Sequence, residues 1–302
     1  MKVFTIIVTY NGKQWYKSCF DSLKQSKYSL NVVIVDNAST DDTVEFVKKN
    51  YPEFTLIESN KNLGFGGANN IGLKYVLEQD ADYVFLLNQD TCIESNVISN
   101  LVEIHQQNSD YGILSPMHIN VAKNKIERDV VDYVTDLKNI SIDFISDLYF
   151  KCLKDVYDIK FINAAAWLLP IDIVKKVGGF DPIFFHYGED DNYIDRVHYH
   201  GLKVGICPNL RIVHDTENRN EIPNENKQSV YKRLLVRWTN INQPFNARKL
   251  TFFYRRKILK FCLKFDKKEC IYYHSILDYL LKMKKNIDVS RSQNVKKASS
   301  WL

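Results

Sequence analysis

The first half of the chain alternates short apolar runs with longer amphipathic segments. Four apolar runs predict buried strands, at residues 4–9, 31–36, 54–58 and 83–88. Apolar positions at helical spacing predict helices near residues 14–27, 41–50, 67–79 and 95–107. Regular alternation of strands and helices is typical of an α/β fold whose mainly parallel central sheet is covered by helices on both faces.

The second half is less regular. Residues 118–160 mix polar and apolar positions, as expected of an excursion or lid over a site. An apolar run at 161–170, a turn cluster at 178–182, a helix at 189–200 and one or two strands at 203–214 follow. Residues 229–285 look helical, and 286–302 look like a loose tail. We therefore predict a catalytic unit at 1–217 and a basic, mostly helical C-terminal extension at 218–302.

Composition supports this division. The chain has 302 residues, 45% of them hydrophobic and 25% charged, which excludes disordered, collagen-like and disulfide-miniprotein classes. Residues 1–220 hold 22 Lys and Arg against 30 Asp and Glu, whereas residues 221–302 hold 19 against 6. Opposite charge in the two regions suggests two tasks.

Cysteine spacing and hydropathy indicate the compartment. The six cysteines form no CxxC pair, so we expect reduced structural thiols. The apolar run near the N-terminus is too short for a signal peptide, and no run of about 18 apolar residues predicts a membrane span. We expect a cytoplasmic protein, with peripheral contact at the inner face of the cell membrane as an open alternative.

Polar side chains collect where the predicted strands end. Asn88-Gln89-Asp90 follows the fourth strand, and side chains two apart in an extended chain point the same way. Two oxygen ligands placed so can hold a hard divalent cation on a diphosphate, although an ordinary Asx turn has the same pattern. Asp36, after the second strand, could accept hydrogen bonds from a nucleobase or ribose. The same segment could instead cap a helix, with Ser39 and Asp42 as a capping box.

Two further segments carry candidate chemistry. The glycines of 60–70 precede a helix and would let backbone N–H groups approach a diphosphate, but they lack the full dinucleotide-binding pattern. Residues 184–191 place aromatic side chains and a glycine before three consecutive carboxylates that open a helix. The helix N-terminus lowers their pKa values and their mutual repulsion raises them, a balance that the sequence leaves open. His214, at the end of a strand-like run, is either a ligand or a structural histidine.

Taken in order, these motifs resemble the inverting family 2 glycosyltransferases of the GT-A fold, and in particular bacterial rhamnosyltransferase-like members that build surface polysaccharide. The resemblance covers roughly residues 3–215. The matching segments are Ile7–Asn11, Val35–Asp41, Asn60–Asn70, Leu87–Thr91, Gly178–Asp181, Phe185–Arg196 and His214.

The resemblance implies a role for each matching residue. Asp190 would be the general base, and Glu189 would orient it or the acceptor. Mg²⁺ or Mn²⁺ would be held by Asp90 and His214, with Asn88 as a weaker ligand because a neutral amide replaces the usual aspartate. The residues that would bind the nucleotide-sugar donor are Thr9, Tyr10, Asn11, Asp36, Asn62, Gly66, Asn69, Asn88 and Gln89. Those that would contact the acceptor are Trp167, His186 and Tyr187, with core packing as the alternative for Trp167.

The resemblance favours dTDP-rhamnose as the donor, with UDP-hexoses and UDP-galactofuranose behind it, and a glycan or lipid-linked glycan as the acceptor. The basic C-terminal region would dock on an anionic membrane, pack on the catalytic unit or form a homodimer, and we expect no nucleic-acid partner. Two other classes stay open at this point. One is an oxidoreductase that binds a nucleotide cofactor at Gly64–Gly67, and the other is a non-catalytic protein that binds nucleic acid or carbohydrate.

Overall fold

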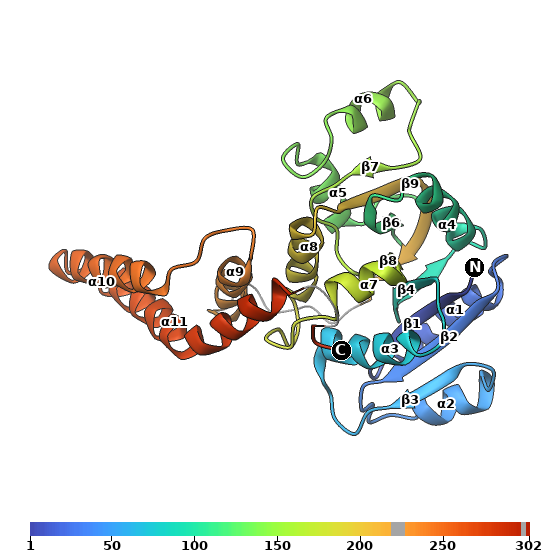
Figure 1. Cartoon of the computed structure of the whole chain (residues 1–302), viewed down its shortest axis with the longest axis horizontal. Helices are drawn as coiled ribbons and strands as arrows, with labels where there is room; N and C mark the ends of the chain where they lie inside the picture. Colours follow the sequence, from blue (N-terminus) through green and yellow to red (C-terminus); the bar gives the residue numbers. More distant parts are fainter. Residues whose placement is uncertain (219–226, 297–299) are drawn as a thin grey trace.

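The computed structural model describes residues 1–218, 227–296 and 300–302 (Figure 1). Its centre is one mixed sheet in the order β3-β2-β1-β4-β8-β6-β9-β5, with β7 paired to β9. The strands are β1 (Val3–Thr9), β2 (Leu30–Asp36), β3 (Thr55–Glu58), β4 (Tyr83–Asn88), β5 (Thr91–Ile93), β6 (Tyr111–Ile119), β7 (Tyr157–Asp158), β8 (Ala166–Pro170) and β9 (Lys203–His214).

The parallel part of the sheet follows the sequence prediction. The pairs β1–β2, β2–β3, β1–β4 and β6–β9 are parallel, and β8 lies antiparallel between β4 and β6. The predicted α/β fold with a mainly parallel central sheet is confirmed. Because the carboxyl ends of β1, β2 and β4 lie at one edge, the polar residues that follow them are brought together there.

Alternate residues of each central strand enter different cores. Ile6 and Leu86 pack on one face, whereas Ile7 and Phe85 pack on the other. Alternate side chains of a strand face opposite sides of the sheet. Because both sides are buried here, the sequence of each strand is a continuous apolar run. The helices between them are α1 (Lys13–Lys24), α2 (Thr43–Asn50), α3 (Gly64–Leu77) and α4 (Val97–Gln107).

The expected capping box is wrong. Helix α2 begins after Asp42, whose side chain makes no capping hydrogen bond. The Ser39 hydroxyl instead donates to Oδ1 of Asp36 at 2.6 Å. Ser39 is thus part of a turn that holds the end of β2, and the serine-to-acid spacing arose by coincidence.

The irregular region from 118 to 160 folds into short elements beside the sheet. They are α5 (Arg128–Thr135), α6 (Asp143–Tyr149) and β7, and they precede α7 (Ile171–Val177) and α8 (Glu189–Tyr199). Val130 and Phe144 enter the same core as Ile6, so this region is a packed layer. Part of α5 reaches the candidate site described below.

After β9 the chain is helical in the part that the structure describes. The helices are α9 (Lys227–Thr239), α10 (Ala247–Leu263) and α11 (Lys267–Asn294). Figure 1 shows α10 and α11 projecting away from the sheet as a long hairpin. None of the described helices is both long enough and apolar enough to cross a bilayer. The division at 217/218 stays a prediction.

The C-terminal helix is joined to the turn at 178–182. Asp181 is buried and accepts hydrogen bonds from Ser290 and from Asn294, at 2.5 and 2.9 Å. The Gly179 amide donates to the carbonyl of Ser300 at 2.8 Å. The expected loose tail at 286–302 is therefore wrong for its described residues, because α11 continues to Asn294.

One cysteine expectation is also overturned. Cys262 and Cys270 are joined as a disulfide where α10 meets α11, and the other four cysteines are free. Their separation of eight residues matches no familiar motif. The hairpin turn between the two helices brings them together, and sequence spacing alone does not predict that turn.

Candidate functional site

A pocket of about 820 Å³ opens at the carboxyl ends of the parallel strands. This volume is within the usual range for a small-molecule or cofactor site. Ten of the predicted site residues line it, namely Tyr10, Asn62, Asn88, Gln89, Asp90, His186, Tyr187, Glu189, Asp190 and His214. They come from positions 10 to 214, so the fold brings together what the sequence keeps far apart.

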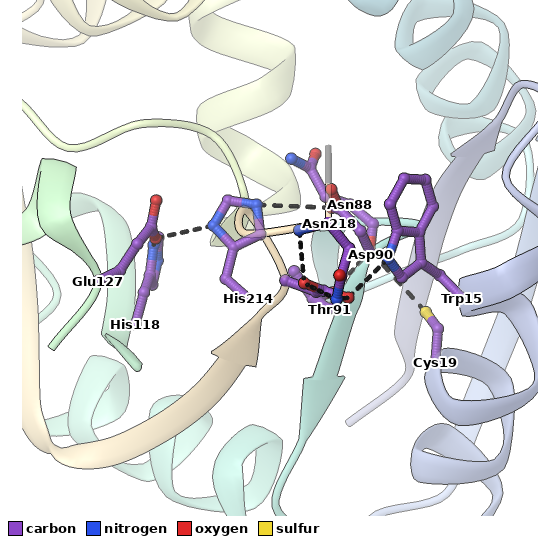
Figure 2. A network of polar contacts seen from close by, with 10 residues as sticks. Trp15, Cys19, Asn88, Asp90, Thr91, His118, Glu127, His214 and Asn218 are labelled. Carbon is purple, nitrogen blue, oxygen red and sulfur yellow. Dashed lines mark hydrogen bonds and ion pairs between the residues drawn. The ribbon is translucent and has the colours of Figure 1, made fainter. Parts of the chain in front are cut away.

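Strand pairing places His214 beside Asp90. The short strand β5 runs antiparallel to β9, with Thr91 opposite His214. Asp90 immediately precedes β5, and its Oδ1 lies 3.5 Å from Nε2 of His214. Both side chains are nearly inaccessible to solvent. This predicted pair is therefore brought together, as Figure 2 shows.

The other ring nitrogen of His214, Nδ1, contacts Glu127, a residue that the sequence motifs did not indicate. Nδ1 of His214 lies 2.8 Å from Oε2 of Glu127, and Nδ1 of His118 lies 3.2 Å from the same oxygen (Figure 2). All three side chains are buried. Because a carboxylate accepts, Nδ1 of each ring carries the proton that it donates to Glu127.

The pKa shifts agree with this arrangement. Burial by itself lowers the pKa of His214, but hydrogen bonds to Asp90 and Glu127 outweigh it, so the pKa is raised. Burial opposes ionisation of Glu127, but its contacts with the two rings hold its pKa below the ordinary value. For His118, burial dominates and lowers the pKa, so this ring stays neutral and accepts at Nε2 from the Ser115 hydroxyl.

These residues fit a divalent cation. His118, Glu127 and His214 offer ligand atoms within 4.8 Å of one another. Since both rings donate to Glu127, that carboxylate is better placed to orient His214 than to bind metal itself. Oδ1 of Asp90 and Nε2 of His214 approach each other to 3.5 Å, on two residues that line the pocket. Their separation is close to the ~3 Å expected between neighbouring ligands of an octahedral ion.

The carboxylates at the start of α8 also line the pocket. Tyr187 and Gly188 both have positive φ, 67° and 98°, and this sharp turn presents the first helical residues to the pocket. Such a conformation at a non-glycine residue is a feature of functional sites. A side chain at position 188 would also meet Val236 of α9 and Phe184.

Burial decides in which direction the pKa values of the three α8 carboxylates shift. Desolvation and then the charge of Asp190 raise the pKa of Glu189 to about 7. Burial likewise raises the pKa of Asp190, against hydrogen bonds from backbone amides, and it raises that of Asp191 to about 7. The helix N-terminus therefore does not dominate, and Glu189 and Asp191 can exchange protons near neutral pH.

A polar wall is built on the ends of β1 and β2. Gln89 accepts from the Tyr10 amide at 2.9 Å. Asn37 donates to Asn62 at 3.0 Å and accepts from the amide of Leu63. Gly64 has φ 73° and lies so close to the carbonyl of Phe185 that a side chain there would collide with it.

Three residues that were expected to touch a donor are not part of this wall. Thr9 is fully buried and donates to Asp36, which is also buried and accepts from the Ser39 amide. Asn11 is exposed and accepts from the Thr40 amide. None of the three lines the pocket. Their hydrogen bonds support the neighbouring loops, and their direct contact with a donor stays a prediction.

Three further predicted residues lie against a core and do not line the pocket. A side chain at Gly66 would meet Phe180, and Asn69 is buried and donates to the carbonyl of Phe65 in its own helix. Trp167 is fully buried between Phe180 and Tyr193, so it cannot contact an acceptor. The core alternative for Trp167 is the correct one.

Helix α5 supplies pocket-lining residues that no sequence motif predicted. Asp129 and Tyr133 line the pocket, and Glu127 precedes them. The expected excursion thus reaches the site. The only signal in the sequence was the mixed polarity of 118–160, and it identifies no single residue.

Comparison with known proteins agrees with this geometry. Residues 5–153, about half of the chain, match the family model described as Glycosyl transferase family 2. The low-salt glycan biosynthesis hexosyltransferase Agl10 of Haloferax volcanii is 23% identical over 211 residues, 70% of this chain and 66% of that protein. The dTDP-rhamnosyl transferase RfbF of Shigella flexneri is 24% identical over 224 residues, covering 70% and 68%.

A shorter and a structural likeness complete the comparison. The O-antigen chain rhamnosyltransferase RfbN of Salmonella typhimurium is 33% identical over 106 residues, 34% of this chain and 32% of its own length. The crystal structure of Staphylococcus aureus TarS 1–349 in complex with UDP superposes with TM-score 0.60 at 14% identity, covering 97% of this chain and 88% of that one. At this identity the likeness establishes the shared GT-A fold.

Proposed function

Because the chain belongs to glycosyl transferase family 2, we propose that it transfers a sugar from a nucleotide-sugar donor to a hydroxyl group of a growing glycan. One observation carries the proposal. The Asp90–His214 pair and the α8 carboxylates line the same pocket. Transfer of a sugar needs both a site for the leaving diphosphate and a base for the acceptor.

The donor is expected at the wall formed by Tyr10, Asn37, Asn62 and Gln89. Amide and hydroxyl groups there can hydrogen-bond to a base and a ribose, and the tyrosine offers a ring face. RfbF and RfbN bear names of rhamnosyl transferases, which favours dTDP-rhamnose as the first candidate. The UDP complex of TarS keeps UDP-sugars as the second.

Asp90 and His214 would hold Mg²⁺ or Mn²⁺, with Asn88 beside them on the pocket wall. When bound, the cation would neutralise charge on the leaving nucleoside diphosphate. Glu127 fixes the His214 ring so that Nε2 faces Asp90. The amide at position 88 contributes no charge, so we expect modest metal affinity.

Asp190 is our candidate for the general base of an inverting displacement. The acceptor hydroxyl would attack opposite the leaving group, and Asp190 would remove its proton as the bond forms. General-base assistance contributes about 10²–10⁴-fold to such a rate. Its place on the pocket wall and its raised pKa support this role, and buried Glu189 would orient it.

The acceptor is expected near His186 and Tyr187, whose rings are 4.0 Å apart at the rim. Lys232 of α9 lies 4.6 Å from the Tyr187 ring, so the C-terminal helices adjoin this side of the pocket. A lipid-linked glycan would suit this position, since its anchor would lie in a membrane close to the basic helices.

A thermal-shift screen tests the proposal. We expect nucleoside diphosphates and nucleotide sugars to stabilise the full chain, more strongly with Mn²⁺ than without it, because a ligand that binds only the folded state raises stability. Stabilisation by NAD(P) alone would instead favour the oxidoreductase. Strong, salt-sensitive binding of RNA without any donor effect would favour the non-catalytic alternative.

A further inference from the structure

The outer face of α10 carries an exposed apolar stripe. The inner face packs on α11, with Tyr254 buried and Phe261 stacked 5.5 Å from Tyr273. On the opposite face, Phe252, Leu259 and Leu263 are 64%, 61% and 72% exposed. Spacings of seven and four residues align these three side chains along one line of the helix. The solvent side of a surface helix is normally polar, so this stripe needs an explanation.

Cations surround the stripe. Arg256 lies within it at helical spacing, with Arg248 and Arg255 along one flank and Lys260 and Lys264 along the other. Residues 247–272 hold nine Lys and Arg against two acidic residues. The Arg256 guanidinium lies 5.7 Å from the centre of the Phe252 ring, so charge and apolar surface adjoin directly.

The tip of the hairpin continues this surface. Phe265, between the two helices, is 91% exposed, and Lys267 and Lys268 follow at the start of α11. Figure 1 shows this tip as the part of the chain that projects beyond the compact sheet-and-helix body. Within the described part of the chain, the apolar side chains Phe252, Leu259, Leu263 and Phe265 stay exposed to solvent.

We propose that this docking face, formed by Phe252, Leu259, Leu263 and Phe265 with the flanking cations, binds the surface of an anionic phospholipid bilayer. Apolar side chains would enter the boundary between headgroups and acyl chains, while the arginines and lysines meet lipid phosphates. Each such cation contributes roughly 1 kcal/mol near an anionic surface. The proposal deepens the lipid-linked acceptor of the proposed function, but the binding itself requires no donor.

The charge and polarity of the docking face argue against two other partners, a second copy of the chain and a nucleic acid. A second copy placed face to face would bring two sets of cations together without counter-charge. A nucleic acid would satisfy the cations but would leave the apolar stripe in water. An anionic bilayer satisfies both parts of the face.

Vesicle flotation of the full chain tests the proposal. We expect retention on vesicles with about 30% phosphatidylglycerol, little retention on phosphatidylcholine alone, and release as NaCl rises from about 0.1 to 0.5 M. The variant F252S/L259S should bind about tenfold more weakly, because apolar burial is lost while every charge is kept. R255Q/R256Q should weaken binding about fivefold per charge.

A matched control lies on α11. Leu281 and Val289 are 49% and 46% exposed, so L281S/V289S removes comparable apolar surface outside the docking face and should bind as the unaltered chain does. Donor-induced thermal shifts should be the same in all variants, which shows that they fold and separates this proposal from the proposed function. Failure of the full chain to float, or full binding by F252S/L259S, overturns the proposal. A dimer abolished by F252S/L259S, or RNA binding without vesicle binding, overturns it as well.

Discussion

Oε2 of Glu127 lies 2.8 Å from Nδ1 of His214, while Nε2 of the same ring lies 3.5 Å from Oδ1 of Asp90. The ring is held between two carboxylates that are 37 positions apart in the sequence. Against burial, their hydrogen bonds raise the pKa of His214. Nε2 is thereby directed at Asp90, and the predictions about metal binding depend on this relationship.

Replacing Asp90 with asparagine should weaken Mn²⁺ binding at least about tenfold, because the charged ligand atom is lost. Calorimetric titration of Mn²⁺ in the presence of a nucleoside diphosphate measures it. Asn88→Asp is the matched opposite change and should tighten binding, since it adds a carboxylate on the same pocket wall. Unchanged affinity in Asp90→Asn would remove Asp90 from the metal site.

Glu127→Gln should lower metal affinity by about 10–100-fold, the usual cost of losing a charged partner of a histidine ligand. The amide still occupies the space, so nucleotide binding without metal should stay the same. Glu103→Gln, an exposed change of the same kind on α4, serves as the control. Should both variants bind Mn²⁺ equally well, Glu127 has only a packing role.

Asp190→Asn should abolish sugar transfer while nucleotide affinity stays near that of the unaltered chain, because an amide cannot remove the acceptor proton. Transfer is measured with labelled donor, and nucleotide affinity by thermal shift. Glu189→Gln should be milder, since we assign Glu189 an orienting role. If Asp190→Asn retains a comparable rate and Glu189→Gln does not, the two roles are reversed.

Asp195 lies on α8 outside the pocket, and burial raises its pKa to about 7 against a hydrogen bond from Asn240. A raised carboxyl pKa means that the folded state binds more protons, so stability falls as pH rises from about 4 to about 7. Asp195→Asn removes this titration. The unfolding free energy of the unaltered chain should fall between pH 5 and pH 8, and in Asp195→Asn this decrease should be smaller by about 1–3 kcal/mol. Urea denaturation at both pH values measures the difference, and equal losses would contradict the assignment.

Short-range patterns predicted the sheet and the strand-end residues well. The runs at 4–9 and 83–88 are continuous and apolar because both faces of the sheet are covered, and β1 and β4 form within a residue of them. Asp90 and His214 were selected separately, and the pairing of Thr91 with His214 brought them together. Strand pairing is a long-range property, so local reasoning gives the candidate ligands but not the distance between them.

The failed prediction for Trp167 and the failure to select Glu127 have the same origin, because long-range packing decides where both side chains point. Trp167 has the side chain that sugar sites use, yet its strand position aims it at Phe180 in the core. Glu127 stands in a segment without periodicity, and its candidate role arises because the distant His214 approaches it and the nearby His118. Residue type alone cannot separate a pocket-facing side chain from one on the other side of the same backbone.

The contacts of Asp181 with Ser290 and Asn294 bear on how the protein is made. A carboxylate buried without its donors is costly, so the turn at 178–182 reaches its final form only when those donors are present. On the ribosome they emerge more than a hundred residues later. The fold should therefore mature only after Asn294 has left the ribosome, and nascent chains released before residue 290 should be poor at binding a donor.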